Sequence, residues 1–122
     1  MVAGDTRSAR TFFTHQHPID GSLSFAATDG VVVIRCRWPF DRSTDEWIEM
    51  SNDFDLDAYT KGIGALKSAG TTEVIGRRGG HLRIRTLQPG SLEVDLVEAA
   101  AQAPTRFFVT IDAQPEALLP VV

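Results

Sequence analysis

The chain has 122 residues and a formal net charge of −4. This length allows one domain with a buried core, and the negative charge argues against nucleic acid as the main partner. No apolar stretch reaches the roughly 18 residues of a membrane-spanning helix, so no membrane partner is expected. The single Cys36 excludes an internal disulfide, and no signal-type apolar run opens the chain, so we expect a cytoplasmic protein.

The N-terminal residues are polar and lack a pattern. We therefore predict a flexible arm over residues 1–10 and a single α+β domain over residues 11–122. Order is expected to begin at Phe12 and Phe13. His15 and His17 would point the same way on a strand, as metal ligands do, but no third ligand is recognisable nearby. Metal binding by this pair is left open, and we name no metal ligand, cofactor or catalytic residue.

Alternating apolar and polar residues predict strands over residues 23–27, 31–38 and 45–51, the first two joined by a turn at residues 28–30. The alternation places Cys36 on the apolar face of the second strand, away from Arg35 and Arg37, which predicts an inert core thiol. In the third strand, Trp47 and Glu49 share the face opposite to the apolar one. Trp47 is therefore a candidate exposed aromatic, or a cover for an open sheet edge.

Residues 52–70 predict the principal helix. An apolar stripe repeats at helical spacing, an acidic first turn suits the helix dipole, and Gly70 suits a C-terminal cap. Gly62 and Gly64 each cost roughly 1 kcal/mol in a helix interior, so the helix is expected to depend on docking its stripe onto a sheet. The stripe consists of Leu56, Tyr59, Ile63 and Leu66.

The three aspartates at residues 53, 55 and 57 match the first positions of a calcium loop. The loop then requires glycine where Ala58 stands and a bidentate glutamate where Gly64 stands. We therefore interpret the aspartates as residues of the helix start.

Four further strands are predicted over residues 71–77, 81–87, 92–97 and 106–112, with turns at Gly79-Gly80 and Gln88-Pro89-Gly90. If Leu87 pairs with Ser91, the register sets Arg85 opposite Glu93, Ile84 opposite Val94, Arg83 opposite Asp95 and Leu82 opposite Leu96. The predicted fold is one antiparallel sheet of six to seven strands, with one principal helix over about residues 55–68 packed on one face.

Negative charge is concentrated in residues 41–57, which contain seven acidic residues and one arginine and therefore have a local charge of −6. We interpret this acidic segment as a docking surface for a basic protein partner, with Trp47 as its aromatic anchor. The alternative is a solvated face with no partner. The candidate partner-binding residues are Asp41, Asp45, Glu46, Trp47, Glu49 and Asp53.

The order of elements resembles small actinobacterial domains that are similar to immunity proteins of polymorphic or wall-associated toxin systems. The resemblance covers residues 23–119. It depends on an amphipathic helix containing DLDAY and on strands ending in TRFFVTIDAQPEAL, with no diagnostic motif. It implies a cytoplasmic bacterial protein that neutralises a toxin domain by binding, without catalysis or cofactor. None of the family's contact residues is defined by a motif, so none is carried over.

Two other functions stay open. One is a structural or accessory subunit that pairs sheet edges, or forms a homodimer through Trp47 and Phe108. The other is a small hydrolase or isomerase with a pocket between helix and sheet, using Tyr59 or Asp57. A neighbouring gene for a large secreted repeat protein with a variable C-terminal domain would support the immunity interpretation.

Overall fold

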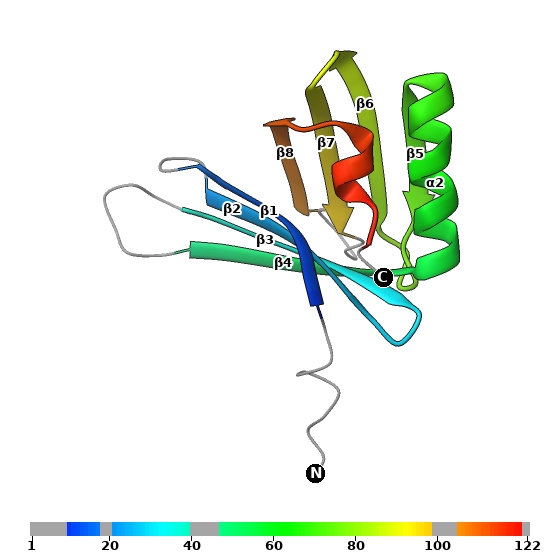
Figure 1. Ribbon diagram of the computed structural model, residues 1–122. Helices are drawn as coiled ribbons and strands as arrows, with labels where there is room; N and C mark the ends of the chain where they lie inside the picture. Colours follow the sequence, from blue (N-terminus) through cyan, green and yellow to red (C-terminus); the bar gives the residue numbers. More distant parts are fainter. Residues whose placement is uncertain (1–9, 18–20, 40–46, 99–104, 121–122) are drawn as a thin grey trace.

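The computed structural model describes residues 10–17, 21–39, 47–98 and 105–120, and Figure 1 traces its elements. In chain order these are β1 (Arg10–His17), β2 (Gly21–Thr28), β3 (Val31–Pro39), β4 (Trp47–Asp55), α2 (Leu56–Ala69), β5 (Thr71–Ile75), β6 (His81–Gln88), β7 (Ser91–Glu98), β8 (Thr105–Asp112) and the 3-10 helix η1 (Pro115–Leu118). None of the helices in these ranges is long and apolar enough to cross a membrane.

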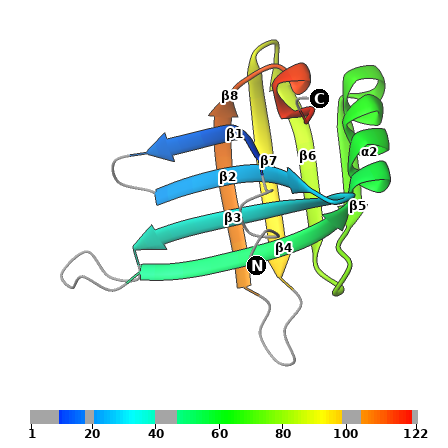
Figure 2. The same cartoon turned by 60° about the horizontal axis from the view of Figure 1, so that its bottom comes forward.

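The strands form two antiparallel sheets of four strands each. Sheet A has the order β1-β2-β3-β4, and sheet B has the order β5-β6-β7-β8. The α+β class is confirmed, but the expected single sheet of six to seven strands is not what forms. The chain leaves sheet A at the end of β4, and α2 carries it to sheet B, whose strands run across those of sheet A (Figure 2). Each sheet can then bury its apolar face against the other.

In sheet A, alternation along each strand decides which side chains are buried. Phe25, Ile34 and Phe54 from three neighbouring strands are fully buried on the face toward sheet B, called here the inner face. The residues between them project from the opposite, outer face. The apolar sequence pattern therefore predicted the faces of β3 correctly.

β4 is longer than predicted, and this corrects the interpretation of one aspartate. Asp53 lies opposite Val33 within the strand, whereas Asp55, opposite Val31, is both the last residue of β4 and the N-cap residue of α2. The ladder with β3 provides backbone hydrogen bonds up to this point. The backbone N–H of Leu56 then donates to the carbonyl of Gly30 at 2.8 Å, and only there does α2 begin.

The predicted helix and its apolar stripe are confirmed. Tyr59, Ile63 and Leu66 are buried, and α2 lies mainly along β5 (Figure 1). Gly70 ends the helix in the left-handed region at φ 81°, and its N–H donates to the carbonyl of Leu66 at 2.9 Å. Gly62 is needed for close packing, because a Cβ there would lie 2.6 Å from Val74 Cγ2.

The predicted register of the β6–β7 hairpin is confirmed for the four pairs from Leu82–Leu96 to Arg85–Glu93. The predicted pairing of Leu87 with Ser91 is wrong. A bulge after Thr86 shifts the register, and Gln88 lies opposite Ser91. An extra residue of this kind is common where a strand runs into a turn.

One core joins the two sheets and the helix. The rings of Trp38 on β3 and Phe107 on β8 lie 5.3 Å apart, and Asn52 Nδ2 donates to the carbonyl of Val97 at 3.1 Å. The Tyr59 hydroxyl donates to the carbonyl of Leu118, which ties α2 to η1. The outward-facing sides of both sheets are left without a covering helix among the described residues, so the search for a binding surface begins there.

Candidate functional site: two charged sheet faces and one pocket

The acidic segment divides between described and undescribed residues. Asp41, Asp45 and Glu46 lie outside the described residues, and for Trp47 the structure gives the backbone, opposite Pro39, but not the side chain. Glu49, Ser51, Asp53 and Asp55 alternate with buried residues of β4 and therefore project from the outer face of sheet A.

The three described carboxylates of this face each lie against an arginine. Arg37 Nε is 3.3 Å from Glu49 Oε1, Arg78 NH2 is 3.3 Å from Asp53 Oδ2, and Arg77 Nε is 3.3 Å from Asp55 Oδ1. The side chains of Glu49 and Asp55 are 72% and 67% exposed. Ion pairs with this exposure contribute about 0–1 kcal/mol each, so the carboxylates can exchange partners at little cost.

The arginines of the β5–β6 turn are functional neighbours that sequence reasoning missed. Arg77 and Arg78 lie against β4, where the Arg77 N–H donates to the Asp53 carbonyl at 2.8 Å. The contact joins residues more than 20 positions apart across two sheets. No local pattern in the sequence reports a contact of this kind.

The outer face of sheet B carries a second set of charges. Arg83 NH2 lies 2.7 Å from Glu73 Oε2, and Arg85 NH2 lies 3.2 Å from Glu93 Oε1. The hydrogen bond from Arg83, followed by its positive charge, lowers the pKa of the Glu73 carboxyl. Each of these pairs joins neighbouring strands of one sheet, as Arg37–Glu49 does on sheet A, whereas Arg77 and Arg78 reach β4 from the β5–β6 turn.

Asp95 is the most deeply buried charge of this face, with its side chain 8% exposed. Arg106 on β8 donates Nε to Asp95 Oδ1 at 2.7 Å and NH2 to Asp95 Oδ2 at 2.8 Å. This two-pronged hydrogen bond, followed by the charge of Asp95, raises the pKa of Arg106. The guanidinium also lies 5.5 Å from the ring centroid of Phe108, a side chain that is itself 52% exposed.

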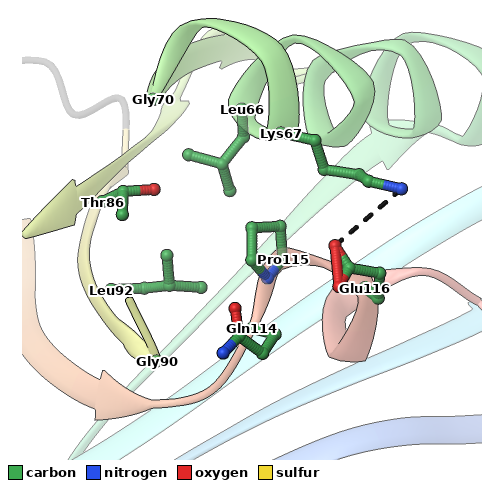
Figure 3. A pocket seen from close by; sticks show the side chains of 9 residues that line it. All are labelled: Leu66, Lys67, Gly70, Thr86, Gly90, Leu92, Gln114, Pro115 and Glu116. Carbon is green, nitrogen blue, oxygen red and sulfur yellow. Dashed lines mark ion pairs between the residues drawn. The ribbon is translucent and has the colours of Figure 1, made fainter. Parts of the chain in front are cut away.

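A pocket of about 290 Å³ opens between the end of α2, the β6–β7 turn and the segment leading into η1 (Figure 3). Leu66, Leu92 and Pro115 supply apolar walls, whereas Lys67 Nζ and Glu116 Oε1 form an ion pair at 3.8 Å. Thr86 and Gln114 add neutral polar groups, so the lining residues can bind a ligand by hydrogen bonds and apolar contacts. The only carboxylate among the lining residues is engaged by Lys67, so no lining residue is arranged as a base beside the Thr86 hydroxyl.

The residues considered for an enzyme do not meet in this pocket. Tyr59 is fully buried, its hydroxyl is engaged by the Leu118 carbonyl, and burial raises its pKa. Asp57 is exposed on the first turn of α2, and neither residue lines the pocket. The proposed catalytic use of Tyr59 therefore has no accessible hydroxyl to act through.

The lone thiol and the described histidine of β1 belong to the interior. Burial, followed by the charge of Glu98, raises the pKa of Cys36 from 9.0 to about 12, which keeps the thiol protonated and inert. His15 Nε2 is buried without a hydrogen-bond partner, and the side chain of His17 lies outside the described part. Within the described ranges, no three metal-ligating side chains come together.

Comparisons with known protein families, with curated proteins and with solved structures found no match. The functional argument therefore depends on the two charged faces and the pocket alone.

Proposed function

We propose that this chain is a non-catalytic binding protein that neutralises a basic protein partner, in the manner of an immunity protein. The contact surface comprises the outer face of β4 and the residues preceding it, which together form the acidic segment. The observation that carries the proposal is the placement of Glu49, Asp53 and Asp55 on one sheet face that no described helix covers. A basic partner would meet these carboxylates together with Asp41, Asp45 and Glu46, with Trp47 as the anchor.

The arginines beside the β4 carboxylates support this function instead of opposing it. A partner's basic groups can replace Arg37, Arg77 and Arg78, because exposed ion pairs cost little to break. Residues 41–46 add three acids against one arginine, so the segment keeps a negative charge beyond those pairs. Such an arrangement raises the association rate by electrostatic steering, while a buried aromatic supplies contact energy.

The immunity interpretation and its bacterial, cytoplasmic setting come from the sequence resemblance, and the cheapest test of them is the gene neighbourhood. A toxin-type secreted protein with a basic C-terminal domain should be encoded beside this chain. If no such neighbour exists in any genome that carries the gene, the immunity form of the proposal fails. Binding of that domain by the purified chain, with loss of the toxin's activity, is the result expected.

The contact surface is tested by two variants of equal charge change, compared by surface plasmon resonance against the neighbouring basic domain. The test variant is Asp45→Lys, Glu46→Lys and Glu49→Lys together, and the control is Asp57→Lys, Asp112→Lys and Glu116→Lys together. Raising the salt from 0.15 M to 1 M shortens the Debye length from about 8 Å to about 3 Å, so it should slow association of the wild type and of the control. Only the test variant should have an association rate that no longer depends on salt.

Trp47→Ala is the third variant, and it should mainly raise the dissociation rate. If both triple variants slow association equally, the effect is one of net charge and the acidic segment is not the contact surface. If binding also ignores Trp47→Ala, the segment is merely a solvated face.

A further inference from the structure

All three exposed large hydrophobic side chains among the described residues belong to sheet B, and two of them, Ile75 and Phe108, project from its outer face. Ile75 on β5 is 63% exposed, Leu87 at the β6 bulge is 46% exposed and Phe108 on β8 is 52% exposed. Ile75 and Phe108 stand on the two edge strands, so the apolar groups frame the charged strands between them. Exposed apolar groups gathered on one face, with polar residues among them, are typical of an interaction surface.

One charge pair between these apolar groups is held in a fixed position. Asp95 fixes Arg106 by two hydrogen bonds of 2.7 and 2.8 Å, and Arg106 in turn covers one side of Phe108. Glu73 and Glu93 each make one contact with Arg83 and Arg85, and these pairs are more exposed. Side chains fixed before binding lose less conformational entropy when they are buried, so this face is prepared for a rigid contact.

The same face contains both a protrusion and a depression. A hollow of about 200 Å³ is bordered by Phe108 on β8 and Thr71 on β5, with Arg83 and Arg85 between them. Guanidinium groups beside a hollow suit the face of an aromatic ring. Phe108 of one molecule can therefore enter the hollow of another, and the reverse contact follows by symmetry. A two-fold interface requires this kind of self-complementary surface.

Charge identifies a second copy as the occupant. The three ion pairs of the face are neutral together, Asp112 at the end of β8 adds one negative charge, and the other −3 of the net charge lies on the rest of the chain. Two copies that approach through this face therefore bring little net charge against each other. Because the signs alternate between neighbouring strands, a copy rotated by a two-fold axis can set arginine against carboxylate.

The size of the face sets the strength of the contact. Four strands about 4.8 Å apart and up to eight residues long, at about 3.3 Å per residue, span about 19 by 26 Å. An area of this order is at the lower end for specific complexes, which bury about 800 Å² per partner. The expected contact is therefore reversible and depends on protein concentration.

We propose that the outer face of sheet B is a homodimer interface, in which Phe108 of each copy enters the hollow beside Arg83 and Arg85 of the other. The outer face of sheet A stays free in each copy of such a dimer. The dimer can then form independently of the partner binding proposed above.

The test is sedimentation velocity on the full chain between about 1 and about 500 µM, a range that covers dissociation constants of a weak dimer. The wild type should shift from monomer to dimer across this range. Phe108→Ser should weaken association at least about tenfold, as loss of an interface anchor does. Val33→Ser, on the outer face of sheet A, is the matched control and should leave association unchanged.

Several outcomes overturn the proposal. The wild type could stay monomeric throughout, Phe108→Ser could associate as strongly as the wild type, or open-ended oligomers could form in place of a dimer. If Phe108→Ser does not give a cooperative thermal transition, Ile75→Ser on the edge strand β5 replaces it and should also weaken association. Binding of the basic partner is measured on the monomeric variant, so its loss or retention reports on the acidic segment separately.

Discussion

The two sheets differ in how they hold the charges that face away from the core. On sheet A, Arg77 and Arg78 reach from the β5–β6 turn to carboxylates of β4, and the contacts are 3.3 Å and largely exposed. On sheet B, charged pairs join neighbouring strands, and Asp95 is nearly buried between two bonds of 2.7 and 2.8 Å. The first face can exchange its partners, whereas the second contains one pair, Asp95 and Arg106, that is fixed before any contact is made.

This difference assigns different uses to faces of similar composition. A surface whose exposed carboxylates can exchange partners suits a basic partner whose charges replace the internal arginines. A surface that combines the fixed Asp95–Arg106 pair with exposed Phe108 suits a rigid and self-complementary contact. Similar numbers of arginines and carboxylates thus give two surfaces because burial and geometry differ, not because the composition does.

The comparison first requires that both sheets share one core, and replacing Ile63 by Asp is the strongest test of this. Ile63 is fully buried on the face of α2 that meets the core. An unpaired carboxylate there should cost several kcal/mol, a large fraction of the roughly 5–15 kcal/mol of an ordinary domain. Ile63→Asp should therefore lack a cooperative thermal transition by circular dichroism.

Ala65→Asp is the matched control for this change, because Ala65 is exposed on the same helix. It should keep a transition close to that of the wild type. A native melting curve for Ile63→Asp would show that α2 is not part of the shared core, and that the two sheets fold separately from it.

The second prediction sharpens the contrast between the two faces. Replacing Arg106 by Met leaves Asp95 nearly buried without its partner, so the melting temperature should fall by about 5 °C or more. Arg37→Met is the corresponding change on sheet A, where Glu49 is 72% exposed, and it should lower the melting temperature by about 2 °C or less. If differential scanning fluorimetry gives the same fall in melting temperature for Arg106→Met and Arg37→Met, the distinction between a fixed and an exchangeable face is wrong.

The third prediction concerns the way α2 joins sheet B. At Gly62 an added Cβ would lie 2.6 Å from Val74 Cγ2 and 3.1 Å from Thr72 Oγ1, whereas at Gly64 no atom lies within 4 Å. Gly64→Ala should raise the free energy of unfolding by about 1 kcal/mol, since alanine favours the helix. Gly62→Ala should lower it by about the same amount, because crowding against β5 exceeds that gain.

Urea denaturation of the two glycine variants provides the comparison, and each serves as the control of the other. Two changes of the same sign would mean that helix propensity alone governs both positions. The close contact of α2 with β5 would then have no energetic role.

The fold was predictable from the sequence where neighbouring residues decide it. The stripe of α2 follows from periodicity, and the β6–β7 register follows from matching charges such as Arg85 with Glu93. The bulge after Thr86 could not be predicted, because it depends on how the turn closes. The division into two sheets escaped prediction as well, since no local pattern tells whether β4 continues into a larger sheet.

The sites were less predictable than the fold. The extension of β4 to Asp55 depends on Val31 and Val33 opposite it, so Asp53 was mistaken for a residue of the helix start, whereas Asp55 is the N-cap residue. The arginine contacts of β4 join distant parts of the chain and have no sequence signal. By contrast, alternation alone placed Glu49 on an exposed strand face.

The smallest expected effect is a pH dependence that belongs to sheet B. The hydrogen bond and charge of Arg83, with a smaller contribution from His81, lower the pKa of Glu73 from its ordinary 4.5. A lowered folded-state pKa means that the pair stabilises the protein at neutral pH, and that this stabilisation is lost as pH falls below about 4.5 and through the folded-state value. The difference in urea midpoint between the wild type and Arg83→Met should therefore be larger at pH 7 than at about pH 3.

Glu73→Gln is the control for the carboxyl in this experiment. It removes the titrating group but keeps Arg83, so its difference from the wild type should shrink over the same pH range. Both effects are small, because Glu73 lies at the surface and salt screens its pair with Arg83. If the difference in urea midpoint between the wild type and Arg83→Met stays constant from pH 7 to about pH 3, the ionised pair of Arg83 and Glu73 does not stabilise the fold. The fixed character of the sheet B face would then depend on Asp95 and Arg106 alone.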